Sequence, residues 1–418
     1  MKIMKKYLNL TALAAIAAAL TFTACSSNEE LANEPPFEPT PVSFNAGFKS
    51  MAVTRTQVSA TAQPTTGNFS IDDKWNTGNV LALYMHDADS KWYLKSYTTG
   101  SSASENAAAT LTAAGTDATK DFYWKNTSEV KIFEAYSFGT NDPIANGTAV
   151  TDADNTTAGG VTIAKFSVNS DQSESNKEFL YNYGAIKYDA NSNTKEIKLN
   201  HQLARIDIVL ITPKSYTLGD AAARASVDKQ ITIGNADSKI ALAGTFAKPT
   251  AFTTYLGSSP TVEDLTKTDK GTWTPSVDNG DQGYITPRVL VAEAAISDNT
   301  YGAENNGKYV TTYSAVVVPQ DFFNKKMFVI TYDGATYAYT GVAAVTTPDG
   351  TDNSKVGTVT DAKDNLGYIE ATDGTSSTNG AGKKYTYKIV IGPTALSVTS
   401  SINDWDDEDQ GSASATLE

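Results

Sequence analysis

The most reactive side chain in the sequence is a single thiol near the N-terminus. Cys25 is the only cysteine of the 418-residue chain. Three lysines within the first six residues, a largely apolar run over residues 8–20 and the short segment Thr21–Ala24 precede it. A basic region, a short apolar region and small residues form a secretory signal peptide, and the apolar run is shorter than the roughly 20 residues of a membrane-spanning helix. The sequence therefore predicts a signal peptide over residues 1–24.

The position of this thiol points to one modification. Residues 21–25 resemble the lipobox of bacterial lipoproteins, in which the cysteine is acylated and becomes the mature N-terminus. The resemblance implies a lipid, such as palmitate, on Cys25 and a chain tethered to a membrane through that lipid alone. The alternative is an ordinary secretory signal followed by an unrelated cysteine. With Cys25 acylated no thiol remains for a disulfide, so apolar burial and strand pairing must stabilise the fold.

The other side chains give little basis for catalysis. The chain has two histidines, His86 and His201, and neither lies in a nucleophile, phosphate-binding or metal-binding motif. We expect His86 at the surface and His201 as a buried, hydrogen-bonded residue. A pair of carboxylates that hydrolyses glycosides is possible in any acidic chain, but no pair stands out here. We therefore predict that the protein is not an enzyme and needs no cofactor.

Two clusters suggest binding rather than catalysis. The acidic run from Asp404 to Asp409 offers oxygen ligands to Ca²⁺, but its spacing is not that of an EF-hand loop. We interpret it as a solvated cluster, with Trp405 packed over the end of the last strand, and predict no metal site. Exposed aromatic residues could instead stack on sugars, although their strand patterns favour burial. These residues are Trp92, Tyr93, Tyr97 and Trp124.

The composition favours strands and an anionic surface. Hydrophobic residues make up 40% of the chain and charged residues only 19%, while Thr, Ser, Asn and Gly are abundant. Such sequences suit short strands joined by polar turns. Loss of residues 1–24 would leave 30 basic and 47 acidic residues. A surface this acidic repels phosphate backbones, so we predict no nucleic-acid partner.

The pattern along the chain predicts an all-β protein. Residues 25–41 contain four prolines and read as a tether. Order begins at Val42, Phe44, Ala46 and Phe48, which alternate with polar residues as in a strand with one buried face. Asp333-Gly334 separates two strand-like runs and predicts a hairpin. Further strands are expected at residues 80–85, 92–98, 122–124, 130–138, 161–168, 195–199, 205–211, 231–233, 309–318, 327–332, 336–340, 385–391 and 396–402, with a short helix at 218–227.

The length predicts two domains. A single core stops growing at roughly 250–300 residues, and this chain is longer. Regularly spaced strands with polar turns indicate β-sandwiches. We place the boundary after the strand at 205–211, which gives one sandwich over residues 42–214 and a second over residues 215–418.

Several segments, taken in order, resemble the fimbrillin-like proteins of Bacteroidota, which are the subunits of type V pili and related surface lipoproteins. Each segment alone is loose, and their order carries the resemblance. The segments are Phe44–Phe48, Thr54-Arg55, Trp75 with Gly78–Tyr84, Phe122–Trp124, Val130–Tyr136, Glu178–Tyr181, Leu199–Ile206, Val317–Gln320 and Ile402–Trp405. The resemblance implies two tandem transthyretin-like β-sandwiches on an outer-membrane lipoprotein exposed at the cell surface.

The resemblance also implies a mechanism of assembly. An arginine-specific surface protease would cut between Arg55 and Thr56 and release the first strand, with Val42, Phe44, Ala46 and Phe48. A strand of another pilus subunit would then fill the groove by strand addition. The candidate donor strand is the C-terminus, with Ala413, Ala415 and Leu417 on one face, and residues 396–402 are an alternative donor.

Two functions follow from these expectations. The first is a structural subunit or tip adhesin of a type V pilus, which binds other subunits and a surface ligand. The alternative is a cell-surface lipoprotein that binds glycans and does not polymerise. An uncut chain with a closed sandwich would fit the alternative or an anchor subunit.

Overall fold

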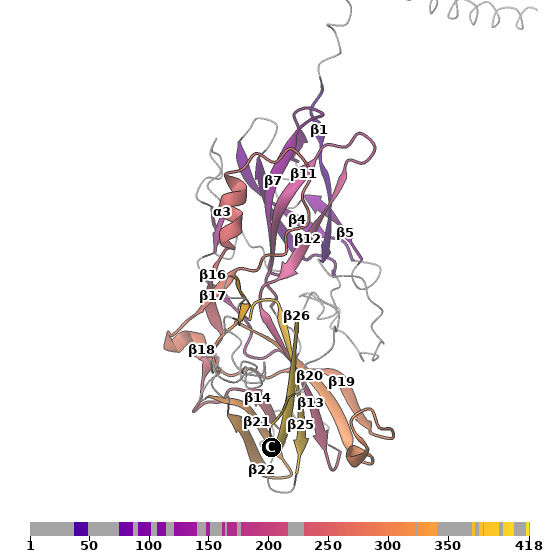
Figure 1. The fold of residues 1–418 in the computed structure, drawn as a ribbon, viewed down its shortest axis with the longest axis vertical. Coiled ribbons are helices and arrows are strands. Elements are labelled where there is room, and N and C mark those ends of the chain that lie inside the picture. The colour runs from indigo at the N-terminus through magenta and orange to yellow at the C-terminus, as the bar shows by residue number, and fades with distance from the viewer. Residues whose placement is uncertain are drawn as a thin grey trace, which may run out of the picture. The chain divides into compact units, whose positions relative to one another are not determined.

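The computed structural model describes residues 37–48, 75–86, 91–101, 107–113, 121–139, 148–150, 161–163, 165–173, 177–215, 230–322, 325–340, 370–372, 376–378, 380–392, 396–404 and 415–417. Nearly all regular elements in these ranges are strands (Figure 1). Contacts gather residues 40–418 into one compact unit. The all-β class is therefore confirmed for the described part of the chain. The signal peptide, the tether up to residue 36 and the helix expected at 218–227 lie outside it.

The strands of the first half are β1 (Thr40–Pro41), β2 (Ser43–Phe48), β3 (Val80–His86), β4 (Trp92–Thr99), β5 (Ala109–Ala113), β6 (Tyr123–Trp124), β7 (Val130–Ser137), β8 (Thr148–Val150), β9 (Val161–Ile163), β10 (Phe166–Ser167), β11 (Leu180–Lys187) and β12 (Thr194–His201). Those of the second half are β13 (Ala204–Thr212), β14 (Gln230–Ile233), β15 (Ile240–Ala241), β16 (Ala243–Ala247), β17 (Thr272–Pro275), β18 (Gln282–Gly283), β19 (Arg288–Ala295), β20 (Tyr309–Val317), β21 (Lys326–Tyr332), β22 (Ala335–Thr340), β23 (Glu370–Thr372), β24 (Ser376–Thr378), β25 (Lys383–Ile391), β26 (Leu396–Asp404) and β27 (Ala415–Leu417). The helix α3 covers Thr250–Leu256, and 3-10 turns lie at Asn279–Asp281 and Ala303–Asn305.

Seven strands of the first half form a closed barrel in the order β11-β12-β2-β5-β4-β3-β7. Two of them change partners along their length. Strand β12 pairs with β2 over Thr194–Leu199 and with β11 at Asn200 and His201. Strand β5 pairs first with β2 and then with β4. Strands that pass from one sheet to another form the corners where two packed sheets join. We predicted a β-sandwich for this half of the chain, and its seven strands form a sheet that closes on itself at two corners.

The second half contains two sheets that pack face to face. One has six strands in the order β19-β20-β13-β25-β26-β27, and the other has the order β14-β21-β22. Phe328 of β21 contacts Tyr387 of β25 across the interface, with ring centroids 4.8 Å apart. Strands β21 and β22 are joined at Asp333 and Gly334, whose φ angles of 51° and 77° are both positive. The hairpin predicted from this Asp-Gly pair is confirmed.

The pairing of β13 corrects one detail of the predicted organisation. We placed this strand at the end of the N-terminal domain. It pairs instead with β20 over nine residues and in parallel with β25 over seven, so it is an interior strand of the second-half sheet. Ile206, Ile208 and Leu210 on its buried face belong to the core formed with Tyr385 and Tyr387. Strand β12 belongs to the barrel and β13 to the six-stranded sheet, so the chain passes from one to the other before residue 214. The division into two domains remains a prediction.

A segment of the second half covers the outer face of the barrel, and we call residues 248–271 the strap. Figure 1 shows its helix α3 beside β7 and β11. The rings of Phe252 and Tyr183 lie 5.2 Å apart, and the backbones of Asp264 and Ala185 exchange hydrogen bonds of 2.8 and 2.9 Å. A side chain at Gly184 would collide with the Asp264 carbonyl, so the close approach requires glycine. The covered strands are therefore buried on both faces.

A charged pair lies under the strap. The Lys248 ammonium is 2.8 Å from Glu134 Oε1 and 3.0 Å from Oε2. The hydroxyls of Tyr136 and Tyr181 donate to Glu134 Oε1 at 2.7 and 3.2 Å. Burial, reinforced by the Glu134 charge, raises the pKa of both hydroxyls well above the ordinary value of 10.0, so they remain donors. The Glu134 side chain is only 1% exposed, so these bonds replace the water it lost.

Candidate functional site

The candidate site is the place of the first strand, β2, in the barrel. The backbone of β2 pairs in parallel with β12 over six residues, from Ser43 with Thr194 to Phe48 with Leu199. On its other side it pairs antiparallel with β5 at Asn45 and Ala46. The strand is thus an interior strand, although it lies close to the start of the described chain. Its withdrawal would leave an open groove between β12 and β5.

The inward side chains of β2, together with Val42 directly before the strand, are those predicted from the alternation. Val42, Phe44, Ala46 and Phe48 are buried, with exposed fractions of 0–4%. Phe44 packs edge-on against Tyr97 and Phe122, at centroid distances of 5.5 and 6.3 Å. The prediction of a one-sided strand is confirmed, and these four residues are part of the core of the barrel.

Phe48, the last residue of β2, lies between two further rings. Trp75 is 4.8 Å away, and His201 stacks on Phe48 at 5.8 Å with an interplanar angle of 13°. His201 is 1% exposed, and its Nδ1 lies 3.5 Å from Glu178 Oε1. The prediction that His201 is buried is confirmed. Its ring packs against Phe48 at the end of the first strand.

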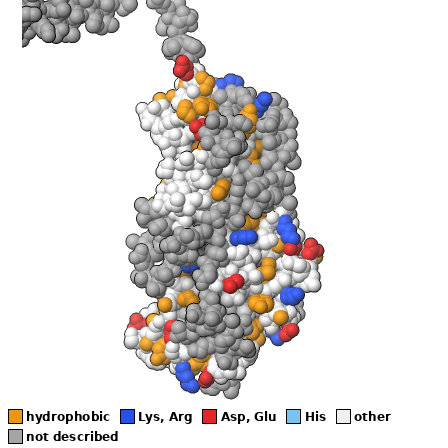
Figure 2. All heavy atoms as spheres, turned by 180° about the vertical axis from the view of Figure 1, so that it is seen from behind, with side chains coloured by type: hydrophobic (Ala, Val, Ile, Leu, Met, Phe, Trp, Pro, Cys, Tyr) orange, Lys and Arg blue, Asp and Glu red, His pale blue; other side chains and the backbone are white. Residues whose placement is uncertain are grey.

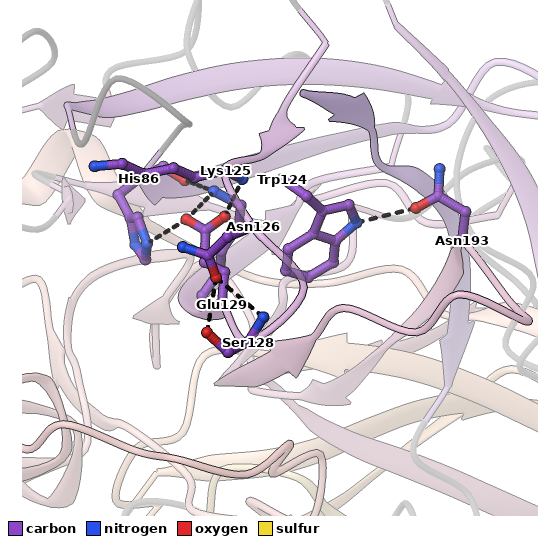
Figure 3. Close-up of polar contacts among 8 residues, drawn as sticks. His86, Trp124, Lys125, Asn126, Ser128, Glu129 and Asn193 are labelled. Carbon is purple, nitrogen blue, oxygen red and sulfur yellow. Dashed lines mark hydrogen bonds and ion pairs between the residues drawn. The ribbon is translucent and has the colours of Figure 1, made fainter. Parts of the chain in front are cut away.

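A set of hydrogen bonds holds the entry of the first strand. Strand β1 pairs with β6, and the Val42 amide donates to the Phe122 carbonyl at 2.7 Å. Asn193 joins three elements. Its side-chain nitrogen donates to the Pro41 carbonyl, and its side-chain oxygen accepts from the Trp124 indole at 3.0 Å. Its backbone carbonyl accepts from the Ser43 amide at 3.2 Å. Figure 3 shows the indole directed at Asn193. These contacts fix where β2 begins.

The loop after β6 is held by a charged cluster, also drawn in Figure 3. Glu129 Oε1 lies 2.8 Å from the Lys131 ammonium and 3.3 Å from His86 Nε2, and Oε2 accepts from the Lys125 amide at 2.5 Å. Burial would raise the pKa of Glu129, but the hydrogen bonds from His86, Lys131 and Lys125 outweigh it and lower the pKa from 4.5 to about 2. His86 was expected at the surface. It is instead half-buried against Trp92, with ring centroids 5.4 Å apart.

Replacing Glu129 with glutamine should make the free energy of unfolding depend less on pH between about 4.5 and 2. The folded-state pKa is depressed, so the carboxylate contributes its full stabilisation above about pH 4.5, and this contribution is lost as the pH falls towards 2. Urea unfolding between pH 2 and pH 6 measures the difference. Glu196→Gln, a change of a more exposed glutamate, is the matched control and should leave the pH dependence close to that of the parent. Curves of Glu129→Gln and parent that run parallel would contradict the prediction.

The other predicted site residues fall into two groups. Cys25, Arg55, Thr56, Ala413 and the run from Trp405 to Asp409 lie outside the described residues, so their roles stay predictions. Ala415 and Leu417 lie in β27, which pairs with β26 at the edge of the six-stranded sheet through three residues. The candidate donor strand is therefore not brought near β2 within this chain by strand pairing.

The proposed sugar platform is not formed at the surface. Trp92, Tyr97 and Trp124 are buried, and Tyr93 is half-buried. The large hydrophobic residues that are exposed in the described ranges are Val262, Val277 and Tyr284. Figure 2 shows the face of the molecule that is hidden in Figure 1. Its hydrophobic side chains lie in separate small groups between polar ones, and charges of both signs are mixed. The expectation that these aromatics belong to the core is confirmed for three of the four.

Several residues of the site were not identified from the sequence. Asn193 was one of many polar residues between strands, and its role depends on Pro41 and Trp124, which are far away along the chain. Gln202 joins the two halves, because its carbonyl accepts from the Trp273 indole and its side-chain oxygen accepts from the Gly271 amide at 2.9 Å. The only sequence signal was the resemblance of the segment Leu199–Ile206.

The described residues contain neither a cluster of metal ligands nor a membrane-spanning helix. No group of three or more His, Cys, Asp or Glu side chains is placed to hold a metal ion there. Within the same ranges, no helix has the length and apolar character required to cross a membrane.

Comparison with known proteins shows the family of the chain. No curated protein sequence matches it. Solved structures with similar folds include a Bacteroides uniformis protein proposed to act in cell adhesion (15% identity, 87% of this chain and 98% of that chain covered, TM-score 0.43). Another is the C-terminally truncated tip fimbrial protein Mfa3 of Porphyromonas gingivalis (12% identity, 88% and 100% covered, TM-score 0.31). Likenesses this distant carry no argument about function. The model of the fimbrillin-like family, however, matches residues 56–405, which is most of the chain, and the protein therefore belongs to the fimbrillin-like family.

Proposed function

We propose that the protein is a structural subunit or tip adhesin of a type V pilus, assembled by exchange of its first strand. It would be exported as a lipoprotein through Cys25, reach the cell surface at the outer membrane and lose residues 25–55 by cleavage after Arg55. Its partners would be the arginine-specific protease, other subunits and a surface ligand. No catalytic step is part of this function.

The observation that carries the proposal is the place of β2. It is the first long strand of the described chain, yet it lies between β12 and β5, with Phe44, Ala46 and Phe48 buried and Val42 buried directly before it. A cut after Arg55 would leave no covalent link between β2 and the barrel, so the strand could leave without unthreading any other element. An interior position would then be open to a strand from a neighbour, which gains backbone hydrogen bonds and four core contacts.

The N-terminus of protein shed from the native cell surface tests the proposal. We expect the mature form to begin at Thr56, as measured by N-terminal sequencing and intact mass. Arg55→Ala should abolish this product, while Lys49→Ala, a change of another basic residue in the same segment, should not. Shed or surface material that begins only at an acylated Cys25 would contradict cleavage.

The alternative function, a glycan-binding lipoprotein that does not polymerise, has less support. The aromatic residues that would form its stacking platform are mainly in the core. Glycan binding by an uncut monomer would nevertheless favour the alternative over the pilus function.

A further inference from the structure

The four inward positions of the first-strand site differ in the size of side chain that they hold. The Phe44 position is lined by the rings of Tyr97 and Phe122, and the Phe48 position by Trp75 and His201. Both positions are aromatic pockets that a small side chain would leave partly empty.

The position between these pockets is small. Ala46 is opposite Ala109 in β5 and Ile197 in β12, and all three are at most 1% exposed. Cores as tightly packed as this one resist added methylene groups, because the neighbours must leave their rotamers. With Val42 at the entry, the order of inward sizes along the strand is medium, large, small, large.

Two segments of the chain can be compared with this order. If Ala413, Ala415 and Leu417 take the places of Phe44, Ala46 and Phe48, the first aromatic pocket is left nearly empty. If the tail shifts by two residues towards the entry, Leu417 falls on the small Ala46 position. The C-terminal tail therefore fits poorly in either register.

The segment from Leu396 to Ile402 fits better. Leu396, Val398, Ser400 and Ile402 would take the places of Val42, Phe44, Ala46 and Phe48, with the small residue at the small position. Ser397, Thr399 and Ser401 would face outward, where β2 has Ser43, Asn45 and Gly47.

The place of this segment in its own subunit permits its transfer. It lies in β26, which is next to β25 and is followed only by β27 at the sheet edge. Residues from 396 onward can therefore leave without changing the order of the other four strands. The transfer gives up nine paired residues with β25 and three with β27 for six with β12 and two with β5, so backbone pairing alone does not favour it and side-chain fit must decide the outcome.

We propose that the first-strand site selects its occupant by the size of the residue at the Ala46 position, and that its occupant is Leu396–Ile402 of a second copy of this chain. The inference rests on the proposed function, since the groove must first open.

Peptide binding to the full chain, after treatment with an arginine-specific protease, tests the inference by fluorescence anisotropy. The labelled peptides are Val42–Phe48 as reference, Leu396–Ile402, Ser412–Glu418, and two variants of the second peptide. Ser400→Leu enlarges the residue at the small position, and Thr399→Leu makes a matched change on the outward face. We expect Leu396–Ile402 to bind more tightly than Ser412–Glu418. Ser400→Leu should weaken binding by about tenfold or more, and Thr399→Leu by less than about threefold.

The outcomes separate the two proposals. If the reference binds but Leu396–Ile402 does not, or if Ser400→Leu binds as well as its parent peptide, the size rule is overturned and strand exchange stands. Tighter binding of Ser412–Glu418 would also overturn the rule. If no peptide binds, the reference included, the groove does not open, and the proposed function falls together with the inference.

Discussion

Replacing Lys248 with alanine should destabilise the protein by about 3–5 kcal/mol, because it leaves the Glu134 carboxylate buried without its cation. Glu134 is 1% exposed and lies 2.8 Å from the ammonium group. The two tyrosine hydroxyls bonded to Glu134 would remain, but they cannot neutralise its charge. Chemical denaturation at neutral pH, followed by tryptophan fluorescence, measures the loss. Removing the carboxylate as well, in Glu134→Gln with Lys248→Ala, should recover part of it.

Lys214→Ala is the matched control for this prediction. Lys214 also forms an ion pair, with Asp333 at 3.1 Å, but both side chains are largely exposed. Exposed pairs are screened by water and salt, so we expect little or no measurable change. Equal effects of Lys214→Ala and Lys248→Ala would show that the pair under the strap is not electrostatically buried in solution.

Replacing Phe44 with alanine should cost about 3–5 kcal/mol, the usual range for truncating a buried phenylalanine. The change removes ring contacts with Tyr97 and Phe122 and leaves a cavity under the first strand. Because the lost contacts tie β2 to the barrel, local opening should become easier than in the parent. Hydrogen exchange should therefore be faster in β2 and in Thr194–Leu199 than in the six-stranded sheet.

Ser43→Ala provides the control, since Ser43 lies on the outward face of the same strand and is exposed. It should change neither the free energy of unfolding nor the exchange rates appreciably. Uniformly faster exchange across both halves in Phe44→Ala would mean that β2 does not open on its own. Such a result would weaken the case for strand withdrawal as the first step of assembly.

The pairing of β2 sets the requirements for such withdrawal. Six residues pair with β12 and two with β5, and Asn193 and Trp124 hold the entry. Spontaneous release would have to break all of these contacts together, which disfavours it in the uncut chain. Cleavage after Arg55 would make release irreversible once the segment diffuses away. In the proposed assembly, cleavage therefore controls when the site can accept a partner.

Local patterns in the sequence determined most of the strands and their buried faces. The alternation of Val42, Phe44, Ala46 and Phe48 predicted the inward face of β2. The pair Asp333-Gly334 predicted the hairpin between β21 and β22. Both signals depend on residues only a few positions apart: side chains alternate across a strand, and a two-residue turn needs residues that tolerate positive φ. The family resemblance likewise rested on short segments in order.

The tertiary structure alone decided which strands pair and which outer faces are covered. Alternation of apolar and polar residues identifies which face of a strand is buried, but it does not say which other strand lies beside it. The pairing of β13 with β20 and β25 was therefore not predicted. Lys248 and Glu134 lie 114 positions apart, and neither residue differs from a surface charge in its local sequence. The helix α3 was missed because a single side chain, Phe252, is buried on it, which leaves no apolar stripe to detect. Contacts between segments far apart in the chain, formed only on folding, thus determined the closed barrel, its strap and the setting of the first strand.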